Sequence, residues 1–303
     1  MITAAISTYN REKYLPQLFE SINKQTISPD LIEIILVDNN SPGNTKELFD
    51  GFQKTYPNLK MSYFLETNQG LSYGRNRGVD ESTGKYITFL DDDAFISDDY
   101  LEKIYNYFEK EESLTAIGSK ILLHYEDKIP AWENKYLNSL LGYFNLGDEP
   151  KRMTKDYPRG SNMSFRSDVF EKVGLFNVEL GRKGNNLAGS EEKDIFQRIF
   201  KQSDMKVLYV PDAIVFHCVP NERTTAEFIK RQALGTGNGE RKRVKNEGGM
   251  STVKRGLIEI AKWGASLLLW VMFLFKGQVS KGAMIVKFRW WVSKGFFLQS
   301  KSS

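Results

Sequence analysis

Cysteine is nearly missing from this sequence, in which Cys218 is the one cysteine among 303 residues. This excludes a disulfide framework within the chain and a zinc site built from several cysteines, and it suits a reducing compartment. The first apolar segment, Ile2–Ile6, has no basic region before it and no cleavage site after it. We therefore expect no secretory signal.

Two nucleotide-binding loops are also missing. The sequence has no GxxxxGKS/T phosphate loop, and no GxGxxG loop follows the first apolar segment. Nucleotide hydrolases and dinucleotide-dependent dehydrogenases use these loops, so both classes are disfavoured.

The composition is that of a globular protein, but its charge is uneven. Apolar residues make up 41% and charged residues 26% of a chain long enough for one large α/β domain with an appendage, or for two modest domains. Residues 221–303 carry 16 Lys and Arg against 5 Glu, a balance of +11, whereas residues 1–220 stand at −7. This argues against a domain that coats nucleic acid and favours a tail that meets an anionic surface.

Short apolar runs alternate with helical patterns over the first 100 residues. The runs indicate strands at 2–7, 31–37, 61–65 and 86–90, and the patterns between them indicate helices at 13–24 and 46–55. The alternation predicts an α/β fold with a mostly parallel sheet flanked by helices. The middle of the chain, 113–190, is less regular, with loops around 148–162 and 181–189 that are candidate substrate loops. A further strand is expected at 206–216, interrupted by Pro211 and Asp212.

Polar residues follow the predicted strands at their carboxyl ends. These clusters are Thr8-Tyr9-Asn10-Arg11, Asp38-Asn39-Asn40, Glu66-Thr67-Asn68 and Asp91-Asp92-Asp93. Ligands of parallel α/β sheets bind outside the carboxyl ends of the strands, so a ligand site is expected there.

The acidic run Asp91-Asp92-Asp93 is the strongest chemical signal in the sequence. Three adjacent carboxylates repel one another unless a positive charge lies among them. A hard cation such as Mg²⁺ or Mn²⁺ takes oxygen ligands and also binds diphosphate oxygens. The alternative is a solvated turn or the start of the helix expected at 100–109. The position after a buried strand, beside other polar strand ends, favours the metal site.

Three further segments have both a structural and a functional interpretation. Asp38 forms either an Asx-turn or a hydrogen-bond acceptor for a nucleotide. The segment Gly70–Gly78, with Arg75 and Arg77, is either a basic helix start or a phosphate contact. Glu191 and Glu192 begin an amphipathic helix, where acids suit the helix dipole, but one of them could also be a general base.

His217 ends an apolar segment beside Cys218. A lone histidine at a strand end is more often structural than a ligand. If it faces the aspartate run, however, it could complete a metal shell.

Seven segments in this order resemble the family 2 glycosyltransferases of the GT-A fold, over residues 2 to about 235. They are Ser7–Arg11, Ile34–Asn39, Asn68–Gly70 with Gly74–Gly78, Phe89–Asp93, Arg159–Arg166, Glu191–Arg198 and Pro211–His217. Each segment alone is a weak signal, whereas seven in family order are highly specific.

The resemblance implies roles for individual residues. Asp38 would bind the nucleotide base and Asp91 the ribose or sugar. Asp93 would hold the divalent metal with His217. Glu192 would be the base, although Glu191 remains a rival because this chain has Glu-Glu where the family has Glu-Asp. The predicted nucleotide-sugar-binding residues are Thr8, Tyr9, Asn10, Arg11, Asp38, Asn68, Gly70, Arg75, Asp91, Asp92, Gly160 and Asn162.

The C-terminal tail is apolar and basic, and it holds four of the five tryptophans. Residues 263–275 are uncharged, but this run is shorter than the roughly 20 residues that span a bilayer. Together with the basic and aromatic segment 287–297, it favours a helix lying in the membrane interface. A tilted span and a soluble packing or dimer helix are the alternatives, and a possible homodimer follows from the last.

The sequence thus predicts a GT-A catalytic domain at 1–220, a basic linker or acceptor-side segment at 221–250, and an amphipathic membrane-associating tail at 251–303. The expected reaction is inverting transfer of a sugar from a nucleoside diphosphate sugar, with uridine as the default base, to a glycan or lipid-linked glycan in cell-surface polysaccharide synthesis. Location would be cytoplasmic, on the inner face of the cell membrane, and no nucleic acid partner is expected. A sugar nucleotidyltransferase and a non-catalytic sugar-binding protein are the alternatives.

Overall fold

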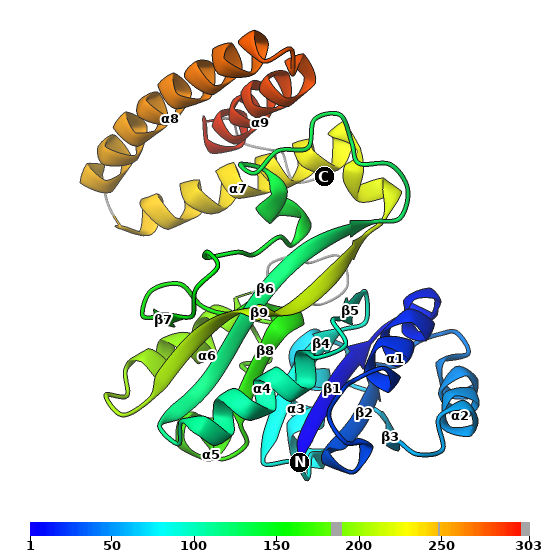
Figure 1. Ribbon diagram of the computed structural model, residues 1–303. Helices are drawn as coiled ribbons and strands as arrows, with labels where there is room; N and C mark the ends of the chain where they lie inside the picture. The colour runs from blue at the N-terminus through cyan, green and yellow to red at the C-terminus, as the bar shows by residue number, and fades with distance from the viewer. Residues whose placement is uncertain (183–189, 248, 298–303) are drawn as a thin grey trace. The chain divides into compact units, whose positions relative to one another are not determined.

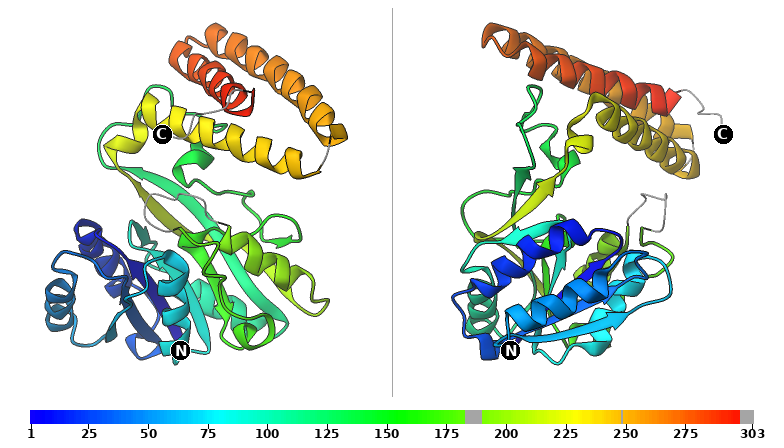
Figure 2. Two further views of the ribbon diagram at one scale, coloured as in Figure 1. Left: turned by 180° about the vertical axis from the view of Figure 1, so that it is seen from behind. Right: turned by 90° about the vertical axis from the view of Figure 1, so that its right-hand side faces the viewer.

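The structure is a computed structural model that describes residues 1–182, 190–247 and 249–297. The chain forms two compact units (Figures 1 and 2). The first unit comprises Met1–Leu122 and Phe144–Cys218, and the second comprises Leu123–Tyr143 and Val219–Ser303. The sequence placed a boundary after residue 220 but gave no sign that residues 123–143 belong with the C-terminal helices.

The first unit is built on a nine-stranded mixed sheet with the order β3-β2-β1-β4-β8-β6-β9-β5, in which β7 also pairs with β9 (Figure 1). Strands β3, β2, β1 and β4 pair in parallel, and β8 begins the antiparallel part. The strands are β1 (Ile2–Thr8), β2 (Ile32–Asp38), β3 (Lys60–Leu65), β4 (Tyr86–Asp91), β5 (Ala94–Ile96), β6 (Leu114–Tyr125), β7 (Lys151–Met153), β8 (Met163–Arg166) and β9 (Lys206–Val219).

Helices connect the parallel strands, as the alternating pattern predicted. The helices of this unit are α1 (Leu15–Asn23), α2 (Thr45–Thr55), α3 (Leu71–Glu81), α4 (Tyr100–Lys110), α5 (Val169–Val173) and α6 (Glu191–Phe200). Every residue of β2 is buried, which explains its nearly continuous apolar sequence. Helix α3 packs closely on β1, where a Cβ added at Gly78 would lie 3.2 Å from Ala5 Cβ.

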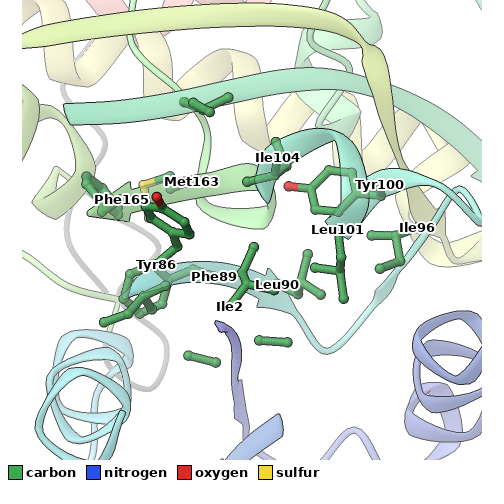
Figure 3. Packing of buried hydrophobic residues seen from close by; sticks show 14 of the residues in the cluster. Ile2, Tyr86, Phe89, Leu90, Ile96, Tyr100, Leu101, Ile104, Met163 and Phe165 are labelled. Atoms are coloured by element: carbon green, nitrogen blue, oxygen red, sulfur yellow. The ribbon is translucent and has the colours of Figure 1, made fainter. Parts of the chain in front are cut away.

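Part of the core of this unit, between the sheet and α4, is shown in Figure 3. Tyr86 and Phe108 stack with ring centroids 4.6 Å apart, and Phe89 meets Phe165 of β8 edge to face. This packing fixes β4, the strand that ends in the aspartate run.

Two sequence predictions need correction. Residues 114–125, which showed no regular pattern, form the long strand β6. The interruption expected at Pro211 and Asp212 was wrong, because β9 is continuous from Lys206 to Val219. Pro211 falls between the stretch of β9 that pairs with β7 and the stretch that pairs with β5. A missing N–H is tolerated at such an edge position.

The second unit contains helices α7 (Ala226–Glu247), α8 (Gly249–Phe275) and α9 (Val279–Phe297), and α8 and α9 lie side by side (Figures 1 and 2). Most of the predicted basic linker is therefore helix α7, which packs against α9. Within the described residues, Arg255–Phe275 is long and apolar enough to cross a membrane, judged by length and composition alone. Residues 298–303 of the predicted tail lie outside the described residues.

Candidate active site

The strand ends of the parallel sheet bring the predicted acidic residues to one edge. Thr8 at the end of β1 lies opposite Asp38 of β2, and Ser7 lies opposite Asp91 of β4. The candidate site is therefore built on three adjacent strands.

Asp38 is buried, and both of its carboxylate oxygens accept hydrogen bonds. The backbone N–H of Ser41 donates to Oδ1 at 2.8 Å, as in the predicted turn, and the Tyr63 hydroxyl donates to Oδ2 at 2.8 Å. Burial and this bond to Asp38 raise the pKa of Tyr63. Tyr63 was missed by the sequence analysis, because only strand pairing brings β3 beside β2.

The neighbouring Asn39 joins two site segments, although the sequence analysis gave it no role of its own. Its side-chain nitrogen donates to the carbonyl oxygen of Asn68 at 2.6 Å, and its side-chain oxygen accepts from the N–H of Gly70 at 2.7 Å. Gly70 has a φ of 142°, which favours glycine at this turn. Asn39 thus positions the predicted residues Asn68 and Gly70.

Tyr9 and Asn10 form an open loop after β1. Tyr9 is 48% exposed, and Asn10 has a φ of 54°, a conformation that asparagine adopts more easily than most residues. The backbone N–H of Asn10 donates to the Ser41 hydroxyl at 3.0 Å. This bond keeps the loop beside Asp38.

The three aspartates of the acidic run have different surroundings. Asp91 is the exposed member, with one third of its side chain accessible, whereas Asp92 and Asp93 are buried. The Thr8 hydroxyl donates to Asp92 at 2.8 Å, and the Arg11 guanidinium forms ion pairs with Asp92 and Asp93. Burial and the charge of Asp93 raise the pKa of Asp92. Arg11 therefore supplies the positive charge that the run requires.

Asp93 and His217 are the predicted metal ligands, and the structure brings them together. His217 Nε2 lies 3.5 Å from Asp93 Oδ1, because β5 pairs with β9 directly after the aspartate run. No group of three or more His, Cys, Asp or Glu side chains that could hold a metal occurs in the described ranges. Asp93 Oδ1 and His217 Nε2 are an oxygen and a nitrogen donor of the kind that a divalent ion would take as ligands, and the other oxygen of Asp93 is paired with Arg11.

A second charged cluster surrounds Arg75, which is 2% exposed although the sequence predicted a ligand contact. Its Nη1 donates to Glu191 Oε1 at 2.9 Å. Its Nη2 lies 3.5 Å from Asp91 Oδ1 and 3.6 Å from Glu192 Oε1. Arg75 thus connects the aspartate run to Glu191 and Glu192, the two candidates for the general base.

Glu191 and Glu192 differ in exposure. Glu191 is buried on Arg75, whereas 23% of the Glu192 side chain is accessible. Burial raises the pKa of Glu192, Arg75 opposes this shift, and Glu191 and Asp91 add to it. A carboxylate of raised pKa that reaches solvent can accept a proton from a bound hydroxyl.

Gly160 and Asn162 lie in the turn before β8. A Cβ at Gly160 would collide with Arg75 Nη2 and Glu192 Oε1, so any other residue there would have to displace one of these side chains. Asn162 is fully buried, and its side chain bonds to the backbone of Arg159 and Ser119. Asn162 therefore shapes the turn from inside. Of the loop predicted at 181–189, residues 183–189 lie outside the described residues.

A surface hollow of about 820 Å³ lies at the opposite edge of the sheet. The end of α3, the start of β4 and the residues after β8 line it, and none of the predicted site residues is among them.

An α/β sheet with acidic strand ends and a partly exposed glutamate beside them is suited to bind a polar ligand at its carboxyl edge. Residues 3–174, more than half of the chain, match glycosyl transferase family 2. The chain belongs to this family and is a glycosyltransferase. This membership disfavours both alternatives considered from the sequence.

Known relatives and solved structures agree with this assignment. The chain is 27% identical over 246 residues to the glucosyl-dolichyl phosphate glucuronosyltransferase of Haloferax volcanii, covering 79% of this chain and 76% of the relative. TarS 1-349 of S. aureus in complex with UDP superposes with a TM-score of 0.54 at 18% identity, covering 78% of this chain and 65% of that one.

The mannosyltransferase PcManGT of Pyrobaculum calidifontis, in complex with GDP-Man and Mn²⁺, superposes with a TM-score of 0.61 at 16% identity, covering 99% of this chain and 88% of that one. These likenesses confirm the GT-A fold that the sequence predicted.

Proposed function

We propose that this glycosyltransferase inverts the anomeric centre of a nucleoside diphosphate sugar and that Glu192 is its general base. The observation that carries the proposal is the contrast between the two adjacent glutamates. Glu191 is buried in an ion pair with Arg75, whereas Glu192 is partly accessible, has a raised pKa and lies near Asp91. A single carboxylate of this kind suffices for a direct displacement.

The displacement takes place in one step. Glu192 takes the proton of the acceptor hydroxyl while the hydroxyl oxygen forms a bond to the anomeric carbon. The bond from that carbon to the diphosphate oxygen breaks, and the nucleoside diphosphate leaves with the electron pair. Glu192 then returns its proton to solvent. Attack opposite the leaving group inverts the configuration.

The donor would lie along the strand ends. Asp38 and the exposed Tyr9 would bind the base, and Asp91 would face the ribose or sugar. Asp93 and His217 would hold a divalent ion, which when bound supplies positive charge to the diphosphate. The solved relatives carry UDP in one case and GDP-Man with Mn²⁺ in another, which supports a nucleotide sugar and a divalent metal. We propose uridine as the nucleoside of the donor.

Donor hydrolysis and thermal melting against UDP-, GDP- and dTDP-sugars, with and without Mn²⁺, test this proposal. We expect a metal-dependent rise in Tm with one donor class. Glu192→Gln should bind that donor and lose at least 100-fold in turnover, whereas Asp93→Asn should weaken metal-dependent binding itself. No response to any donor would refute the donor class. Normal turnover by Glu192→Gln would refute the assignment of Glu192 as the general base.

We also propose that the acceptor is a lipid-linked glycan reached at a membrane. Helix α8 carries an exposed apolar stripe at helical spacing, made of Leu257, Ile260, Leu267, Leu268, Val271 and Phe275. Of its polar side chains, Arg255, Glu259 and Ser266 are buried, whereas Lys262 is exposed. A helix with polar residues inside and apolar residues outside suits lipid better than water.

The contacts of α8 favour an interfacial hairpin over a lone span. Glu259 accepts a hydrogen bond from Ser293 at 2.9 Å and pairs with Arg289 at 3.3 Å, both from α9. Trp263 also donates to Ser293. Because α9 carries Lys281, Lys287, Arg289 and Lys294, it does not suit a bilayer core. The pair would lie in the interface on the cytoplasmic face. The relative from Haloferax volcanii, named for a dolichyl phosphate substrate, supports this acceptor class.

A further inference from the structure

Arg75 is held in place from several sides, although its sequence neighbourhood resembles a ligand-binding loop. Helix α3 approaches β1 through Gly74, where a Cβ would lie 2.6 Å from Ser7 Oγ. The guanidinium lies over the Phe176 ring at 5.6 Å. The next residue, Asn76, exchanges hydrogen bonds of 2.9 Å with both backbone groups of Phe176. These contacts aim the Arg75 side chain away from solvent.

The two terminal nitrogens of Arg75 have different surroundings. Nη1 donates to Glu191, which is as deeply buried as Arg75 itself. Nη2 is buried and, within the part of the chain that the structure describes, makes no hydrogen bond. It lies between Asp91 and Glu192, 3.5 and 3.6 Å from their nearest oxygens. One nitrogen therefore fixes a carboxylate, and the other faces the two carboxylates that are open to substrate.

We propose that Arg75 is a positioning residue that keeps Glu191 out of the chemistry and orients Glu192 for proton transfer. The pair Arg75–Glu191 is a fixed, internally neutral support, and Nη2 holds the reactive carboxylate by charge alone. Glu192 is thereby free to turn toward an acceptor hydroxyl. This inference rests on the proposed role of Glu192 as base.

Charges of both signs then act on Glu192 from neighbouring positions. Besides burial, the charged groups that face it are Arg75 from α3, Asp91 from β4, Glu191 from its own helix and Arg182 from the preceding loop. Removing the negative charge of Glu191 should favour ionised Glu192, and removing the positive charge of Arg75 should disfavour it. If Glu191 and Arg75 served packing alone, altering them would not shift the pKa of Glu192 in opposite directions.

The first test needs no substrate. The Tm difference between the protein and Glu192→Gln, followed from pH 4 to 9, reports where Glu192 titrates. Because the folded-state pKa of Glu192 is raised, the glutamate loses stability relative to glutamine as pH rises through that value. We expect this transition to move down by roughly 1 pH unit in a Glu191→Gln background. It should move up by a smaller amount in an Arg75→Lys background, because a lysine ammonium that pairs with Glu191 no longer places a charged nitrogen beside Glu192.

A buried carboxylate elsewhere provides the matched control. Glu33 is also buried and paired with a lysine, so Glu33→Gln should lower Tm without moving the Glu192 transition. Arg75→Lys keeps a cation for Glu191 and is chosen over Arg75→Gln, which could fail to fold. If Arg75→Lys does not fold, Glu191→Gln alone decides the inference. An unmoved transition in Glu191→Gln overturns it.

The second test follows hydrolysis of UDP-glucose, UDP-N-acetylglucosamine and GDP-mannose against pH. Glu191→Gln should keep far more of its kcat than Glu192→Gln does, and it should shift the acidic limb of the pH–rate profile to lower pH. Arg75→Lys should lower kcat and shift the limb to higher pH. Loss of turnover in Glu191→Gln with retention in Glu192→Gln overturns the inference. Hydrolysis of none of the donors would count against the proposed function, whereas the melting test would still decide the role of Arg75.

Discussion

The carboxylates at this site divide into two groups according to how far their side chains are exposed. Asp92 and Asp93 are buried around Arg11, and Glu191 is buried on Arg75. Asp91 and Glu192 are the members of each set that reach solvent. A buried carboxylate needs such a partner, because an unpaired charge away from water is costly. The paired acids therefore build the site, and the accessible ones are available to substrate.

Gly160 provides a prediction at the scale of one residue. Gly160→Ala places a methyl group against Arg75 Nη2 and Glu192 Oε1, so one of them must move. We expect stability to fall by about 1–3 kcal/mol and kcat to fall by roughly 10- to 100-fold, with donor binding retained. Urea denaturation and donor hydrolysis measure the two effects.

Gly51 in α2 is the matched control. A Cβ there meets nothing within 4 Å, so Gly51→Ala should stabilise the helix by about 0.5–1 kcal/mol and leave activity unchanged. If Gly160→Ala behaves like Gly51→Ala, the close approach at Arg75 does not matter for the reaction.

At the scale of elements, Glu33 ties the start of β2 to the turn before β4. It accepts hydrogen bonds from the Thr3 hydroxyl and from the N–H and hydroxyl of Thr83, and it pairs with Lys60 at 2.5 Å. Burial raises the pKa of Glu33, but these bonds outweigh it and lower the pKa to about 2. A carboxylate at the far end of the strand from the site thus holds the parallel sheet together.

This lowered pKa predicts an acid sensitivity. Glu33 stabilises the fold fully above its unfolded pKa of 4.5, and this contribution of about 3 kcal/mol is lost as pH falls from 4.5 toward 2. The stability difference between the protein and Glu33→Gln should therefore shrink between pH 6 and pH 3 in urea denaturation. Gly51→Ala, which removes no titratable group, should show no such trend. A constant difference for Glu33→Gln would contradict the assignment.

Sequence patterns predicted elements wherever neighbouring residues decide the structure. The buried strands and the helices between them follow from periodicity, since each buries its own apolar face. Strand β6 was missed and β9 was divided at Pro211, because both depend on partner strands that are distant in sequence. Edge pairing tolerates a proline that an interior strand would not.

At the scale of the whole molecule, the exposed apolar stripe of α8 and the basic residues of α9 predict that the protein binds membranes. Vesicles of phosphatidylcholine with and without phosphatidylglycerol should float the protein, more strongly with the anionic lipid and at low salt. Leu268→Glu places a charge on the exposed stripe of α8 and should reduce flotation at least several-fold.

Leu175→Glu places the same charge on an exposed leucine of the first unit and should float like the unaltered protein. Equal flotation of Leu268→Glu and the unaltered protein, or no flotation with either lipid, would refute the interfacial hairpin.

The sequence by itself determined the family, the α/β fold and the strand ends at which the acids gather, because these follow from periodicity and from motifs of adjacent residues. Tertiary structure alone decided which carboxylates are paired. Arg75 and Glu191 are 116 positions apart, and Asp93 and His217 meet only because β5 pairs with β9. Burial and long-range charge distinguish Glu192 from Glu191. The sequence shows neither property, because it gives only two adjacent glutamates.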